Sequence, residues 1–187
     1  MTVAIKDDNN IPDILRELDE LGRSVVEVGV FEDQDTTILL IATVNEFGCE
    51  IVVTEKMRRY LIGRSRELGL RSGEGGLYMK VGSKIRIPER SFIRTGFDNS
   101  IDEVQRKADE ILSDVVAGRA RAGKLLSFVG IELQGAIIEQ IRRGEFAPNH
   151  PFTIASKSTS SGRGDQPLMD TGKLASPAAI KWRIVQR

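Results

Sequence analysis

Residues 89–143 read ERSFIRTGFDNSIDEVQRKADEILSDVVAGRARAGKLLSFVGIELQGAIIEQIRR, and this stretch decides the fold. Two series of apolar residues recur in it at helical spacing, which keeps each series on one face of an α-helix. The series are Ile101, Val104, Ala108, Ile111, Val115 and then Leu126, Val129, Leu133, Ile137, Ile141. Gly118, between them, suits a left-handed turn that ends the first helix. The pattern predicts a helical hairpin over residues 89–143, with Pro88 at its opening, whose apolar stripes pack on each other and on a sheet.

The bulk composition is that of an ordinary globular domain. The chain has 187 residues, of which 40% are hydrophobic and 29% are charged, and these values favour one domain with arms. Its 27 basic and 27 acidic residues give a net charge of zero. A neutral chain argues against a protein that binds nucleic acid by neutralising phosphates.

The sequence also indicates the cellular compartment in which the protein is expected. Cys49 is the single cysteine, so no internal disulfide forms and a reducing environment is expected. The sequence contains no run of about 18 apolar residues, the length that a membrane-spanning helix needs, so no membrane span is expected. Residues 1–10 lack the basic-then-apolar order of a signal peptide. We therefore expect a protein that is made in a cytoplasm and does not enter a membrane.

Upstream of the hairpin, the sequence predicts an arm followed by short elements. Residues 1–10 are acidic and polar and are expected to be flexible, and residues 11–21 form an amphipathic helix. Residues 25–31 are rich in β-branched side chains and predict a strand, as residues 51–53 do more briefly. Residues 38–47 leave helix and strand open, because periodicity does not decide a short apolar run.

Between these elements and the hairpin, the sequence predicts a helix and a β-hairpin. Thr54 is a suitable N-cap for a helix over residues 54–68. One face of that helix is basic, carrying Arg58, Arg59, Arg64 and Arg66. This face is either a solvated surface or a contact for an acidic neighbour or a phosphate backbone. Residues 77–81 and 84–87 predict two strands around a turn.

Downstream of the hairpin, the composition becomes polar. Residues 156–164 are almost entirely Ser, Thr, Gly, Lys and Arg, which predicts a mobile loop. Residues 178–185 predict a terminal strand, because Ile180, Trp182 and Ile184 alternate with polar residues and fall on one face.

These predictions describe one α+β domain over residues 1–187. A small, mostly antiparallel sheet packs against the long helical hairpin, with a flexible N-terminal arm and a long Gly/Ser loop. The segments are the arm (1–10), strands and helices (24–88), the helical hairpin (89–143), the loop (144–166), and a C-terminal turn and strand (167–187).

The residue types needed for catalysis or metal binding are sparse. His150 is the single histidine, and one histidine with one cysteine does not build a zinc site. Asp98 and Asp102 lie on a predicted helix surface among basic residues, which favours a solvated face over acid–base chemistry. Residues 73–76 are glycine-rich but lack the Lys-Ser/Thr of a phosphate-binding loop. We therefore expect no catalytic residue, no metal ligand and no cofactor.

Four short phrases resemble those of a known family. They are VNEFG (44–48), IRIPERSFIR (85–94), PNHPFTI (148–154) and PLMDTGKL (167–174). In this order they resemble the phrases of phage virion-morphogenesis, or tail-completion, proteins of the head–tail joining region. Residues 175–178 depart from the family's polar run, which leaves the register of the last strand open.

The resemblance implies a structural virion protein of a tailed phage, located at the neck or tail top and assembled in the host cytoplasm. It implies a homohexameric ring that joins the head connector or stopper to the tail tube or terminator. DNA passes through such a ring without sequence-specific binding. The alternative within this class is a tail terminator that caps the tail tube. The resemblance also favours helix for residues 38–47. A nuclease that uses Asp98 or Asp102, or a DNA-binding regulator that uses residues 54–68, is less favoured.

The candidate subunit-interface residues are Arg58, Arg59, Arg90, Arg94 and Asp170. Arg90 and Arg94 are four residues apart in the predicted hairpin, so they are expected to share a helix face and to reach carboxylates of an adjoining subunit. The alternative is that both serve the core of the monomer. Asp170 begins an Asp-Thr-Gly turn or cap that pins the returning chain.

Overall fold

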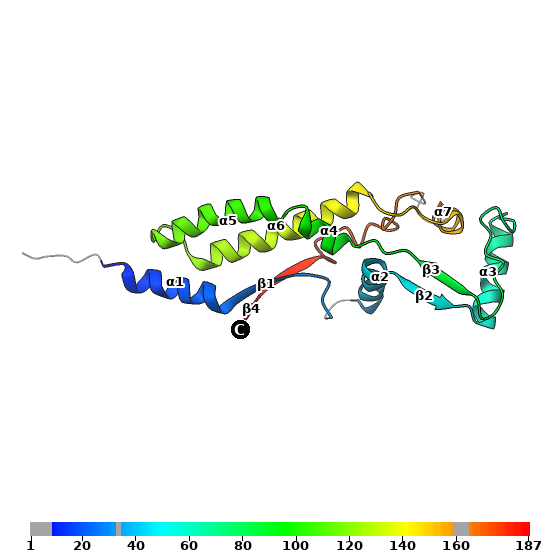
Figure 1. The fold of residues 1–187 in the computed structure, drawn as a ribbon, viewed down its shortest axis with the longest axis horizontal. Helices are drawn as coiled ribbons and strands as arrows, with labels where there is room; N and C mark the ends of the chain where they lie inside the picture. The colour runs from blue at the N-terminus through cyan, green and yellow to red at the C-terminus, as the bar shows by residue number, and fades with distance from the viewer. Residues whose placement is uncertain (1–8, 33–34, 159–164) are drawn as a thin grey trace, which may run out of the picture.

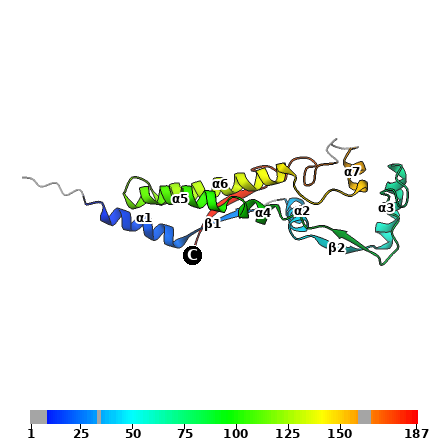
Figure 2. The ribbon, with the colours of Figure 1, turned by 45° about the horizontal axis from the view of Figure 1, so that its top comes forward.

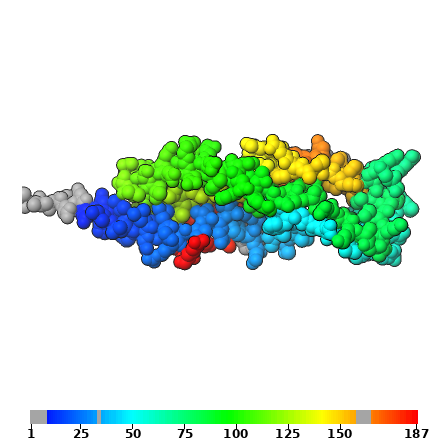
Figure 3. Space-filling view, in the orientation of Figure 1, coloured from blue at the N-terminus to red at the C-terminus, as the bar shows by residue number. Residues whose placement is uncertain are grey.

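The computed structural model describes residues 9–32, 35–158 and 165–187. The predicted arm therefore lies outside the described residues from 1 to 8, as the predicted Gly/Ser loop does from 159 to 164. The molecule is elongated: the helical hairpin runs along one half and helix α3 stands at the opposite end (Figure 1). The space-filling view shows the same long outline, with the first helix at one tip and the α3 region at the other (Figure 3).

The structure confirms the α+β fold with a helical hairpin against a small antiparallel sheet. Helices α5 (Ile101–Val116) and α6 (Ala122–Arg143) form the hairpin. Gly118 lies between them with a φ of 69°, which is the left-handed turn expected there. Helix α6 ends at Gly144, also left-handed, with basic Arg142 and Arg143 in its last turn. These basic residues are favoured by the dipole at that end.

The first arm of the hairpin is shorter than predicted, because a separate helix precedes it. Helix α4 spans Phe92–Asp98 and has its C-cap at Asn99. The Ser100 hydroxyl donates to the Gly96 carbonyl at 2.8 Å, and the Asn99 amide donates to Gln140 at 3.3 Å. Side-chain bonds of this kind compete with helix continuation. The prediction that Pro88 opens the hairpin is therefore wrong, since residues 88–91 are not helical.

The main sheet pairs the two ends of the chain. Strand β1 (Ser24–Gly29) is antiparallel to β4 (Lys181–Gln186), with Val28 opposite Trp182. Trp182 packs on α6 at Gly130, where a Cβ atom would clash with the indole ring. The last strand begins at Lys181 rather than at residue 178, so fully buried Ile180 lies just before it; within the strand, Ile184 of the predicted buried face is 38% exposed.

Helix α1 leads directly into this sheet. It spans Ile11–Arg23, two residues beyond the predicted end, and continues past Gly22 into β1. Its C-cap Ser24 donates a backbone hydrogen bond to the Leu21 carbonyl. The Glu17 carboxylate accepts a 2.7 Å bond from the Ala122 N–H and so joins α1 to the start of α6. The helix therefore lies beside the hairpin turn (Figure 1).

The second half of the molecule is a separate β ribbon that carries α3. Helix α2 (Thr36–Phe47) resolves the open choice for residues 38–47 in favour of helix. Strand β2 (Cys49–Val52) pairs with β3 (Lys84–Ile87), and α3 (Glu55–Glu67) connects them through an irregular segment. Thr54 caps α3 as predicted, accepting from the Met57 N–H at 3.3 Å. Figure 2 shows this ribbon extending away from the hairpin.

Two predictions for the irregular segments are corrected. Residues 77–81 are not a strand, because β3 takes β2 as its partner; Val53 donates to the Ser83 carbonyl at 2.8 Å and closes that pairing. Within the loop predicted over residues 144–166, the structure places helix α7 (Pro151–Ser158). Proline suits the first turn of a helix, since its missing N–H needs no partner there.

The core lies where α4, α6 and the segment before β4 meet. Phe92, Ile137, Ile141 and Ile180 are at most 2% exposed, and Ile138, Leu174, Ala175 and Ala42 of α2 complete the cluster. Gly96 allows α4 to approach α6 closely, because a Cβ atom at that position would lie 2.9 Å from the Ile137 Cα. No helix in the described part of the chain is long and apolar enough to span a bilayer.

Candidate functional site

The four phrases picked out in the sequence meet in one region of the fold. Asn45 and Glu46 lie at the end of α2, Arg90 lies between β3 and α4, and Asn149 precedes α7. The turn that begins near Pro167 completes the region. These segments are far apart in the sequence but are joined by hydrogen bonds, so we call the region the phrase junction.

Arg90 is the centre of the phrase junction. It is only 8% exposed, and its guanidinium donates to the carbonyls of Ala147 at 2.9 Å and Pro148 at 3.2 Å. It also donates to the side-chain oxygens of Asn45 at 3.2 Å and Asn149 at 3.4 Å. Burial lowers the pKa of the Arg90 guanidinium, because the charged form is taken out of water.

The backbone strengthens the link between the first two phrases. The Arg90 N–H donates to the Asn45 carbonyl at 2.6 Å. Glu46 is 6% exposed, and its carboxylate accepts from the N–H groups of Ile93 at 2.9 Å and Arg94 at 3.1 Å. A carboxylate at this position satisfies otherwise unpaired donors and is favoured by the helix dipole. Glu46 thus caps α4 from another helix.

Two hydrogen bonds join the chain around the third phrase to the chain around the fourth, one from Asn149 to the residue that precedes the fourth phrase and one from Lys157, which follows the third. The Asn149 amide donates to the Gln166 carbonyl at 3.2 Å, and the Lys157 ammonium donates to the Met169 carbonyl at 3.3 Å. Burial lowers the pKa of Lys157, the nearby Asp170 carboxylate raises it in part, and the Arg90 charge lowers it further. The balance leaves its pKa below the ordinary value of 10.5.

A groove of about 700 Å³ opens beside the phrase junction. Its walls are largely apolar, with Ile41 and Val44 of α2, Ile85 and Ile87 of β3, and Leu168. The lining also includes the polar or charged side chains of Arg86, Arg90, His150, Lys157 and Asp170. Among the described residues, no three potential metal-ligating side chains lie together. The apolar part of the wall suits contact with an apolar surface.

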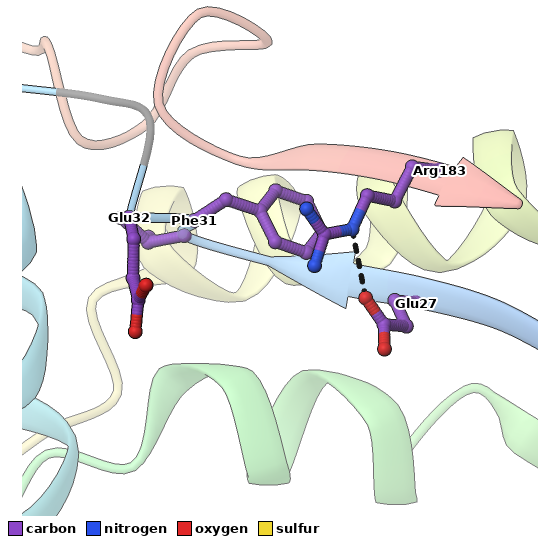
Figure 4. A pocket seen from close by; sticks show the side chains of 5 residues that line it. Glu27, Phe31, Glu32 and Arg183 are labelled. Atoms are coloured by element: carbon purple, nitrogen blue, oxygen red, sulfur yellow. Dashed lines mark hydrogen bonds and ion pairs between the residues drawn. The ribbon is translucent and has the colours of Figure 1, made fainter. Parts of the chain in front are cut away.

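A second surface hollow lies beside β1 and is lined by Glu27, Val30, Phe31, Glu32 and Arg183 (Figure 4). The Arg183 guanidinium lies 4.2 Å from the centroid of the Phe31 ring and forms a 2.8 Å ion pair with Glu27. Figure 4 shows the arginine directed at both partners, while Glu32 points away. The cation–π contact and the ion pair of Arg183 both join β4 to the β1 segment of the chain.

The predicted interface residues separate into two groups. Arg90 is buried with its donors directed within the chain, so the geometry favours the alternative that it serves the monomer. Arg94 lies on the exposed side of α4 and pairs with Glu89 at 3.2 Å. The expectation that Arg90 and Arg94 share a helix face is wrong, because α4 begins only at Phe92.

The remaining interface candidates lie on the surface. Arg58 and Arg59 are on α3, where both approach the Glu55 carboxylate, at 3.6 Å and 3.1 Å. Asp170 is exposed at the edge of the phrase junction. Arg58 and Arg59 therefore lie at the opposite end of the ribbon from Arg90, and the five candidates do not form one patch (Figure 1).

Reasoning from the sequence missed the roles of Glu46, Asn149 and Lys157. Glu46 is one residue in a quoted phrase, yet nothing local shows that its carboxylate caps a helix 47 residues later. Lys157 falls in a segment whose composition favours a loop. Comparison with known proteins gives no further guide, since no family model, curated protein or solved structure matches the chain.

Proposed function

We propose that this protein is a structural component of a tailed-phage particle that forms a ring at the neck and completes the joint between head and tail. The single observation that carries the proposal is the phrase junction. Arg90 and Glu46 join the first three phrases that resemble the tail-completion family, and Lys157, which follows the third phrase, donates to Met169 in the fourth. Segments that depend on one another for their hydrogen bonds form one structural unit, which supports taking the four phrases together.

The exposed apolar side chains add support. Ile11 and Leu15 on α1 are 62% and 60% exposed, Phe47 at the end of α2 is 67% exposed, and Tyr60 on α3 is 65% exposed. Ile11 and Leu15 lie one turn apart on α1, so together they expose a contiguous apolar surface of the kind that another protein covers. In a ring each copy contacts two neighbours through two different surfaces, which suits a chain with exposed apolar residues at both ends.

The phrase junction suits a rigid structural component of the particle. A buried guanidinium that donates to several backbone carbonyls fixes the angle between the β2–β3 ribbon and the hairpin half of the molecule. In the proposed ring, a fixed angle sets the diameter of the channel through which DNA passes without base-specific contacts. Neighbouring components, the head connector or stopper above and the tail tube or terminator below, then meet a surface of constant shape.

The experiment is a deletion of the coding sequence in the phage or prophage that carries it, followed by electron microscopy of lysates. We expect DNA-filled heads and separate tails that do not join, and joining restored by the wild-type chain. Tails of uncontrolled length would instead indicate the tail terminator of the alternative reading. Normal, infectious particles from the deletion strain would reject the proposal.

A further inference from the structure

We infer that copies of this chain join head to tail, with the exposed apolar stripe of α1 on one copy seated on the basic α3 end of the next. The α1 stripe is Ile11, Leu15 and Leu18. The α3 end is helix α3 together with Val52 and Val81 at the tip of the β2–β3 ribbon. The inference deepens the proposed function, since it names the two surfaces that would close the ring.

The two ends carry opposite charge, although the whole chain is neutral. Helix α1 contains four acidic and two basic residues, a net charge of −2. Helix α3 contains five basic and two acidic residues, a net charge of +3. Helix α1 and the α3 end lie at opposite tips of the long molecule (Figure 1, Figure 3). Opposite charges at opposite ends attract between copies and not within one copy.

The α1 stripe is the uncovered half of an apolar helix face. Ile14 and Leu21 are half-buried, and Ile14 lies near Gly118 at the hairpin turn. The remaining apolar side chains, Ile11 and Leu15, are about 60% exposed, and Leu18 is 37% exposed. They recur at intervals of four and three, which places them on one line along the helix. None of the thirteen residues of α1 is buried, so the chain itself leaves this line open.

The α3 end offers a matching apolar surface inside a basic rim. Tyr60 is 65% exposed on the side of α3 away from buried Leu61 and Ser65. Val52 and Val81 are 55% and 53% exposed at the adjoining tip of the ribbon. A Cβ atom at Gly63, one turn after Tyr60, would meet no atom within 4 Å, so another helix can approach closely there.

The basic rim consists of exposed side chains around Tyr60. Lys56, Arg59 and Arg66 are all exposed, and no described residue forms an ion pair with Arg66. An aromatic centre with arginines around it is the composition that carries most binding energy at protein interfaces. An acidic helix with an apolar line complements this surface in both respects, and helix α1 has that composition.

The geometry makes the contact heterologous. The α1 stripe and the α3 end are different surfaces, so each copy presents one of each after any single contact forms. Such contacts produce a ring when the rotation closes and a filament when it does not. They do not produce a two-fold dimer. This property gives the inference a test that does not depend on any other phage component.

The test uses two full-length variants, each altered on one surface only. Leu15→Glu places a charge in the α1 stripe, and Tyr60→Ala with Arg59→Glu removes the α3 contact. Size-exclusion chromatography with light scattering should show wild-type oligomers and monomers for each variant. Tyr60→Ala alone should weaken association about 30-fold, the factor expected for a central aromatic residue. An equimolar mixture of the two surface variants should form a dimer and stop there, because each retains one intact and complementary surface.

Two variants altered outside both surfaces serve as controls for the proposed contact. Ile131→Glu alters an apolar residue on α6 that is 54% exposed, and Arg106→Glu reverses an exposed charge on α5; both should assemble like the wild type. A mixture that remains monomeric, or a monomeric wild type, would overturn the inference. A monomeric wild type that binds a duplex DNA probe, and loses it with Arg59→Glu, would assign the α3 end to phosphate binding instead. Head-to-tail assembly of a chain whose deletion leaves particles intact would reject the proposed function but not this contact.

Discussion

The Glu46 carboxylate accepts a 2.9 Å hydrogen bond from the backbone N–H of Ile93 and thereby holds the start of α4 to the end of α2. Replacing Glu46 with Ala removes the acceptor of two part-buried N–H donors. We expect a loss of about 1–2 kcal/mol in the free energy of unfolding, the range for a lost helix cap. Glu50→Ala is the control, because that carboxylate is exposed and should cost no more than about 0.5 kcal/mol. Urea titration followed by circular dichroism measures both values, and equal losses would contradict the capping role.

Arg90→Lys tests whether the guanidinium fork, rather than its charge, holds the phrase junction. Lysine keeps the positive charge but has a single donor atom, so it does not reach both the Ala147 carbonyl and the Asn45 side chain. Acceptors left without donors in a buried site should lower the free energy of unfolding by about 2–3 kcal/mol. Arg94→Lys, on the exposed side of α4, should change it by less than about 0.5 kcal/mol. A stability loss that is no larger for Arg90→Lys than for Arg94→Lys would show that charge alone suffices.

Two glycines on α6 should respond oppositely to the same substitution. Gly130→Ala drives a methyl group into the Trp182 ring and should lower stability by about 1–3 kcal/mol, the usual cost of overpacking. Gly135→Ala meets no atom within 4 Å and should raise stability by about 0.5–1 kcal/mol, because alanine favours the helix. Thermal melts of the two variants provide the measurement. Tryptophan fluorescence adds a second readout, because Trp182 is the single tryptophan and should shift only in Gly130→Ala.

Lys157 should make stability depend on alkaline pH. Burial lowers its folded pKa below 10.5, so the unfolded chain binds more protons than the folded chain between those two values. The free energy of unfolding contributed by Lys157 therefore rises as pH increases through that window. Comparison of wild type with Lys157→Met at a series of alkaline pH values should show the difference moving in favour of the wild type. A difference that is constant with pH would mean that the lysine is not desolvated.

The helices could be predicted from the sequence because their signal is local. The apolar spacing that began at Ile101 and Leu126 identified α5 and α6, and Thr54 marked the start of α3. The buried faces of α5 and α6 could also be predicted from this spacing, since Val104, Leu133 and Ile137 are buried in the structure. The prediction for α7 is wrong, because its serine and threonine residues favour a loop, whereas the structure has a helix that begins at Pro151.

The pairings could not be predicted in the same way, because each depends on partners far along the chain. The sequence predicts residues 77–81, the neighbouring segment, as the partner of β3, whereas its partner in the structure is β2. The roles of Arg90 and Glu46 required knowledge that α2, α4 and the Asn149 segment converge. A single sequence contains the polar residues of such a junction but not the contacts that bury them.

The pairing of β1 with β4 imposes an order on biosynthesis. Val25, Val26 and Val28 leave the ribosome early, yet their strand partners lie at residues 181–186. The nascent chain therefore holds an unpaired, apolar strand until translation has passed those positions, and sheet closure is a late, non-local event. A truncated product that lacks β4 also lacks Trp182 against α6. Only polypeptides translated through that strand acquire the finished sheet.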